Sequence, residues 1–100
     1  MIGHTGDLNA AIKAIEVVDD CVQKIVTCSF ENGGDCLITA DHGNAEEMLD
    51  KDGNIVTSHT VNKVPVILCS KKYVNATLKK GGRLANIAPT ILQLLNIPIP

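Results

Sequence analysis

The chain has 100 residues, of which 45% are hydrophobic and 20% charged, and its formal net charge is -2. This length and composition predict one small globular domain and exclude an intrinsically disordered chain. Basic residues do not gather in a block, and only Phe30 and Tyr73 are aromatic. The sequence therefore predicts neither a nucleic-acid-binding surface nor binding to an anionic membrane.

The apolar runs are too short to cross a bilayer. Each covers only a few residues, whereas a membrane-spanning helix needs about 20. No secretory signal is visible at the amino terminus. We therefore expect a cytoplasmic protein without a membrane partner.

The first predicted element is a long amphipathic helix. Apolar residues recur at helical spacing between Leu8 and Val26 and would line one face. Asp7 is suited to cap the amino terminus of this helix, and residues 32–34, Asn-Gly-Gly, are predicted to end it.

A strand is predicted next, from Cys36 to Ala40. This run is short, mostly apolar and preceded by two glycines, which is typical of a strand buried on both faces of a parallel sheet. In such sheets ligands bind beyond the carboxyl ends of the strands. Asp41 and His42 follow directly at that end.

The segment after His42 is predicted to contain a short helix. Asn44 is suited to cap a helix over Ala45–Leu49, and Glu47 completes the pattern of a capping box. These two residues are interpreted as caps without a catalytic role, and Glu46 as a solvated charge.

The remaining elements complete an alternating pattern. Residues 50–54 are predicted to form a polar turn, Ile55–Thr57 an edge strand and Val64–Cys69 a second buried strand. Asn86 would cap a final helix that ends before Pro98. This order of helices and strands predicts an α/β fold.

The four cysteines do not form a zinc or redox motif, since none is spaced as C-x-x-C. Cys21 and Cys28 lie two helical turns apart, about 10 Å along a helix axis, which is too far for a disulfide. Cys21, Cys28, Cys36 and Cys69 are predicted to be buried thiols.

Three histidines and one aspartate are the candidate metal ligands. Asp41 and His42 are adjacent, and His4 and His59 each lie in a predicted turn. Neutral imidazole and carboxylate oxygen together suit a borderline divalent ion. Taken singly, Asp41-His42 also fits a strand-ending turn, and His4 and His59 fit surface histidines. The presence of all four residues together favours a metal site.

Four motifs in sequence order resemble the cofactor-independent phosphoglycerate mutases of the alkaline phosphatase superfamily. They are Met-Ile-Gly-His-Thr-Gly at 1–6, Thr-Ala-Asp-His-Gly-Asn-Ala-Glu at 39–46, Ser-His-Thr-x-Asn-x-Val-Pro-Val at 58–66 and Leu-Ala-Asn-Ile-Ala-Pro-Thr-Ile-Leu at 84–92. The resemblance implies that residues 1–100 are the carboxyl-terminal part of a metal-binding, phosphatase-like three-layer domain. Its mostly parallel sheet would be incomplete in this chain.

The resemblance also implies two divalent metal ions, most often Mn²⁺. Asp41 and His42 would hold the ion that binds a nucleophilic serine, and His4 and His59 the ion that positions the substrate. The enzyme would be a monomeric isomerase of glycolysis that interconverts 3-phosphoglycerate and 2-phosphoglycerate through phosphoserine. No catalytic residue is expected in this chain, because the family's serine lies upstream.

The chain therefore looks like the carboxyl-terminal fifth of such an enzyme. One more family aspartate would stand immediately before Met1. Alone, the chain is expected to be inactive, to bind metal weakly and to be marginally stable. Two alternatives stay open: another superfamily phosphotransferase, such as a phosphopentomutase, or a non-catalytic metal-binding module.

Overall fold

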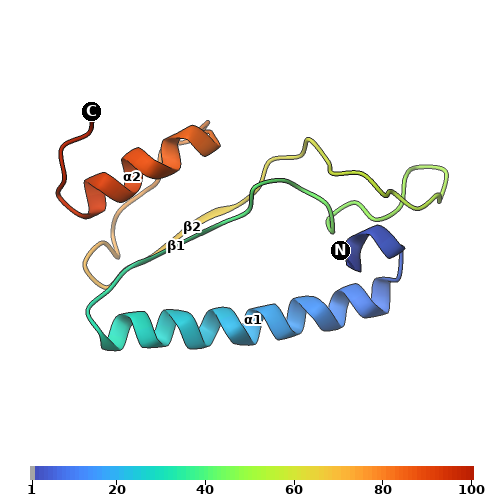
Figure 1. The fold of residues 1–100 in the computed structure, drawn as a ribbon, viewed down its shortest axis with the longest axis horizontal. Helices are drawn as coiled ribbons and strands as arrows, with labels where there is room; N and C mark the ends of the chain where they lie inside the picture. The colour runs from blue at the N-terminus through green and yellow to red at the C-terminus, as the bar shows by residue number, and fades with distance from the viewer. Residues whose placement is uncertain (1) are drawn as a thin grey trace.

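The computed structural model describes residues 2–100, so Met1 of the first motif lies outside the described residues. The elements follow in the order η1 (Ile2–Thr5), α1 (Leu8–Glu31), β1 (Cys36–Thr39), β2 (Val66–Cys69), η2 (Leu84–Asn86) and α2 (Ile87–Leu94). Figure 1 shows α1 running along the two strands, while the segment between them extends back toward the amino terminus. This mixture of helix and strand confirms the predicted α/β class.

The long helix α1 begins and ends where the sequence predicts. The Asp7 carboxylate accepts a hydrogen bond from the backbone N–H of Ala10 at 3.0 Å, which confirms its capping role. At the other end the Asn32 backbone N–H donates to the Cys28 carbonyl at 3.2 Å. Gly33 then adopts a φ of 72°, a conformation that glycine enters without steric cost.

The apolar face of α1 is much less buried than its pattern predicts. Ala11 is its one buried residue, whereas Leu8 and Ile25 are each 63% exposed. The two strands are only four residues long and cover little of this face. The radius of gyration is 16.4 Å, against about 13 Å for a compact domain of this length. The described part of the chain is therefore elongated, with a small core.

Strands β1 and β2 form a two-stranded antiparallel sheet in which Cys36 lies opposite Cys69 and Thr39 opposite Val66. Both predicted strands are present, but the expectation of parallel neighbours is wrong for this pair. A parallel pair needs a crossover connection, usually helical, and this connection carries no helix. Both strands are also only partly buried, because described residues cover little of either face.

The prediction of a helix over Ala45–Leu49 is wrong. The Asn44 backbone N–H donates to the Glu46 carboxylate at 2.6 Å, and Leu49 forms an antiparallel bridge with Ile55. These contacts fold the segment into a turn, because side-chain acceptors compete with helical hydrogen bonds. Residues 55–57 form only that isolated bridge instead of the predicted edge strand.

The polar turn at residues 50–54 and the final helix are both present. The Asp50 carboxylate accepts from the backbone N–H groups of Asp52 and Asn54, each at 2.9 Å. Helix α2 begins after Asn86, but the Asn86 side chain does not cap it. That side chain instead accepts from the Arg83 backbone N–H at 2.8 Å, at the start of η2.

The buried-thiol prediction is wrong for Cys21 and Cys28, which are exposed, while Cys36 and Cys69 are half-buried. The first pair lies on α1. Between residues 2 and 100, no helix combines the length and apolar character required to cross a membrane.

Candidate metal centre

The four predicted ligands come from three separate segments. His4 lies in η1, Asp41 and His42 follow β1, and His59 lies in the connection to β2. The structure gathers the three imidazoles. The rings of His42 and His59 stack with centroids 3.5 Å apart and planes 12° apart, and the His4 centroid is 5.8 Å from that of His59. Asp41 joins them through its Oδ1, which is 3.7 Å from His42 Nε2.

The contacts of His42 leave one ring nitrogen available. Its Nδ1 is 3.1 Å from the Gly43 carbonyl oxygen, which can only accept a hydrogen bond. The hydrogen therefore sits on Nδ1, and Nε2 keeps its lone pair. This is the arrangement in which a metal-ligating histidine is oriented by a backbone carbonyl. The side chain is 37% exposed and that of Asp41 86%, so both are accessible to a ligand.

Asn44 links the segments that carry the histidines. Its amide nitrogen is 3.4 Å from His4 Nδ1 and 3.4 Å from the Ser58 carbonyl oxygen. A Cβ atom on Gly3 would collide with the Asn44 side chain, so glycine is needed for this close approach. The interpretation of Asn44 as a helix cap is therefore wrong. Its place directly after Asp41-His42-Gly43 was the sequence signal for a role in the site.

Glu46 joins the two loops more tightly than its interpretation as a solvated charge suggested. It accepts from the Thr60 hydroxyl, from the Asn44 backbone N–H at 2.6 Å and from the Asn62 amide at 3.2 Å. These hydrogen bonds, the one from Thr60 above all, lower the pKa of Glu46 from 4.5 to about 2. Sequence reasoning missed this residue, because its partners lie 14 and 16 positions along the chain.

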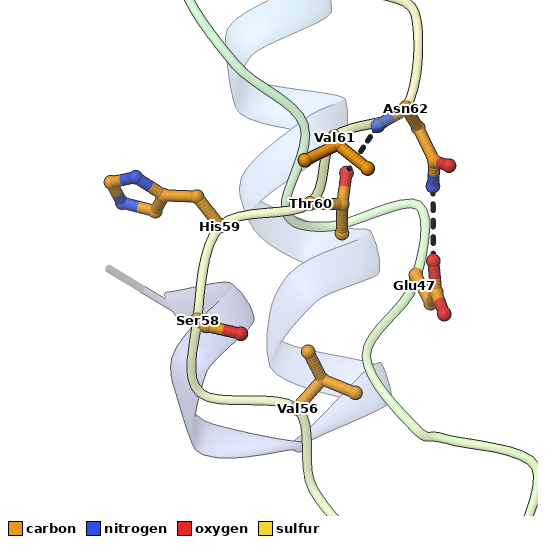
Figure 2. Close-up of a pocket in the computed structure, with 7 residues that line it drawn as sticks. All are labelled: Glu47, Val56, Ser58, His59, Thr60, Val61 and Asn62. Carbon is orange, nitrogen blue, oxygen red and sulfur yellow. Dashed lines mark hydrogen bonds between the residues drawn. The ribbon is translucent and has the colours of Figure 1, made fainter.

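A shallow hollow of about 270 Å³ lies beside His59. Figure 2 shows its lining residues, with Glu47 and Asn62 on one side of the 58–62 segment and the His59 ring directed away from them. Asn62 donates to Glu47 at 3.0 Å there. His59 thus lines the hollow, while its ring points away from Glu47 and Asn62.

The chain matches the family model described as the metalloenzyme superfamily over residues 1–99. It belongs to this superfamily. The resemblance carried by the four motifs is also confirmed, since whole-chain similarity extends to proteins named 2,3-bisphosphoglycerate-independent phosphoglycerate mutase.

Three such relatives illustrate the match. Identity is 52% over 101 residues with the protein of Clostridioides difficile (strain 630), 55% over 107 residues with that of Prochlorococcus marinus subsp. pastoris and 48% over 101 residues with that of Rhodopirellula baltica. Each match covers 100% of this chain but only 19–20% of the relative. The chain thus spans about a fifth of the length of the curated relatives it matches.

The donor set fits the divalent-metal use that the metalloenzyme superfamily implies. Two ligands about 2.1 Å from one ion lie about 3.0–3.5 Å apart, and the His42 Nε2 to Asp41 Oδ1 distance of 3.7 Å is close to that. Across residues 2–100, however, no three His, Cys, Asp or Glu side chains are arranged to hold one ion. Two of the candidate donor atoms, His42 Nε2 and Asp41 Oδ1, lie close enough together to share an ion.

Proposed function

We propose that this chain forms part of the metal centre of a 2,3-bisphosphoglycerate-independent phosphoglycerate mutase. The observation that carries the proposal is the convergence of His4, His42 and His59 from segments far apart in sequence, with Asp41 beside them. The proteins that match the whole chain at about half identity bear this enzyme name. Residues 1–100 would be the carboxyl-terminal part of the metal-binding domain.

In this proposal Asp41 and His42 hold one divalent ion, and His4 and His59 hold a second. Mn²⁺ is the proposed ion, because imidazole with carboxylate suits borderline divalent metals. Such ions, when bound, neutralise charge on the attacking and leaving oxygens of a phosphoryl transfer. The protein's own contribution is orientation: the Gly43 carbonyl holds the His42 tautomer, and Asn44 connects His4 to the His59 segment.

The proposed reaction interconverts 3-phosphoglycerate and 2-phosphoglycerate in glycolysis. A serine contributed from outside residues 1–100 would take the phosphoryl group from one hydroxyl of glycerate and return it to the other. This chain would supply metal ligands and no nucleophile. We further propose a cytoplasmic, monomeric enzyme.

Metal removal and substrate choice test the proposal together. The full-length protein that contains residues 1–100 is dialysed against EDTA. It is assayed with 3-phosphoglycerate before and after Mn²⁺ is added. We expect activity to disappear with the metal and to return with Mn²⁺. Undiminished activity after thorough chelation would overturn the metal assignment.

The same protein, assayed with ribose 1-phosphate, tests the phosphopentomutase alternative. Turnover of the pentose phosphate without turnover of phosphoglycerate would replace the mutase assignment. Saturable Mn²⁺ binding without turnover of either substrate would support a non-catalytic metal-binding module.

A further inference from the structure

The His59 ring owes its position to its neighbours in the chain. His59 is exposed, and no other described residue holds its ring by a hydrogen bond. The residues on either side both make hydrogen bonds to the facing loop. The Ser58 carbonyl accepts from the Asn44 side chain, and the Thr60 backbone N–H donates to the Gly43 carbonyl at 2.9 Å.

Glu46 makes further hydrogen bonds between the two loops. Its Oε1 accepts from the Thr60 hydroxyl and from the Asn62 amide, while Oε2 accepts from the Asn44 backbone N–H. One carboxylate thus binds the loop that carries His42 and the loop that carries His59. Hydrogen bonds to an ionised acceptor are about twice as strong as neutral ones.

The packing around Gly43 shows how closely the two loops approach. Gly43 is buried, and a Cβ atom there would collide with both the Glu46 carboxylate and the Thr60 hydroxyl. The contact therefore depends on a glycine next to His42. Gly43 and Thr60 are also partners in an antiparallel bridge.

The neighbouring carboxylate provides a contrast. Glu47 is also exposed, but it accepts only from the Asn62 amide, at 3.0 Å, among the described side-chain contacts. Among the described hydrogen bonds none joins Glu47 to Thr60, so its link to the facing loop is made two residues further from His59. The two glutamates are adjacent and chemically identical, and both accept from Asn62. Among the described hydrogen bonds, only Glu46 also accepts from Thr60, the residue next to His59.

The geometry points to Glu46 and Thr60 as a positioning pair that holds the His59 ring against His42 and sets the metal affinity of the site. This inference rests on the proposed metal site and deepens it, since neither residue is a ligand. The pair acts through the backbone of residues 59 and 60. Residues that orient metal ligands change metal affinity by about 10–100-fold when they are replaced.

The first test measures Mn²⁺ affinity of the intact protein by isothermal titration calorimetry. Glu46→Ala and Thr60→Val should each weaken binding by about tenfold, the low end of that range, because they act one residue away from the ligand. Thr60→Ser, which keeps the hydroxyl, should restore wild-type affinity. Glu47→Ala and Thr57→Val are the matched controls and should bind as the wild type does.

The second test needs no metal. In NMR spectra of the metal-free protein, stacked rings give nuclear Overhauser contacts between His42 and His59, which wild type and Glu47→Ala should show. Glu46→Ala and Thr60→Val should lose them while keeping the same thermal midpoint within a few degrees. Equal affinities and equal ring contacts in Glu46→Ala and Glu47→Ala would overturn the positioning role.

If Glu46→Ala does not fold, a comparison of Thr60→Val with Thr60→Ser tests the positioning role instead. Equal affinity in these two variants would overturn the positioning role, because they differ chiefly in the hydroxyl. A wild-type protein that binds no Mn²⁺ would overturn the proposed metal site. The metal-free NMR comparison would still decide whether Glu46 and Thr60 position the ring.

Discussion

The regular elements and the loop region are stabilised in different ways. In α1 and β2, large apolar side chains remain exposed, with Ile15 at 57% and Ile67 at 50%. In the loops of residues 41–47 and 58–62, side chains bond to the backbone and side chains of the facing loop. The scaffold forms from local signals and buries little, whereas the candidate site depends on specific polar contacts.

Substitutions in the two regions should therefore have different effects. Changes in the loops should alter metal binding more than overall stability, since the loops carry the ligands. Changes at the ends of α1 should alter stability and leave the ligands in place.

Removal of the His42 imidazole should have the largest effect. In the full-length protein, His42→Ala should lower the proposed mutase activity by at least about 100-fold, because even residues that only orient a ligand cost up to that much. The circular dichroism spectrum should not change, since the side chain is 37% exposed and fills no core. Lys63→Ala, at an exposed residue, is the control. Near-normal turnover in His42→Ala would remove this residue from the site.

A methyl group at Gly43 should break the contact between the loops. Gly43→Ala places a Cβ atom against Glu46 and Thr60, so we expect Mn²⁺ affinity to fall by about tenfold. Gly82→Ala is a matched control, because its Cβ would meet only the Asn86 side chain at an ordinary 3.8 Å. Calorimetric titration of both variants measures the difference. Equal affinities would show that the loops tolerate separation.

The sequence predicted the regular elements well because their signals are local. Asp7 and the Asn-Gly-Gly run at 32–34 mark the ends of α1, and these act within one helical turn. The candidate ligands were also proposed from sequence, because histidine and aspartate carry their chemistry in the residue type, and their role as ligands stays a prediction.

The errors arose where distant contacts compete with local ones. Asn44 and Glu47 match a capping box, but the Glu46 carboxylate bonds to Thr60 and turns the backbone away from a helix. The helical spacing of apolar residues likewise predicts which face of α1 is apolar, but it does not predict what covers that face. The pairing direction of β1 depends on the path of the whole connection, which no local pattern records.

Loss of the α1 cap tests whether the regular elements affect stability without affecting metal binding. Asp7→Ala removes the acceptor for the Ala10 N–H, and we expect the free energy of unfolding to fall by about 1 kcal/mol. Urea denaturation of the intact protein measures this change, with Asp35→Ala as the control at an exposed aspartate. Mn²⁺ affinity should stay at the wild-type value, because Asp7 does not contact the histidines. A weakened affinity would show that helix and site are coupled.

Acidification should give the smallest effect and tests the loop contact itself. The hydrogen bonds from Thr60 and the other donors lower the pKa of Glu46 from 4.5 to about 2. Because this folded-state pKa lies below the unfolded value, the carboxylate stabilises the fold above about pH 4.5, and the contribution disappears as the pH falls toward about 2.

Thermal midpoints of metal-free wild type and Glu46→Gln should therefore differ near pH 6, and the difference should shrink below about pH 4.5 and disappear only near about pH 2. The difference should be small, since the side chain is exposed and solvent screens it. Glu47→Gln, which lacks the Thr60 contact, should track the wild type over the whole range. A Glu46→Gln difference that stayed constant with pH would mean that the charge of Glu46 does not hold the two loops together. Thr60 would then act only through the shape of its side chain and its backbone pairing with Gly43.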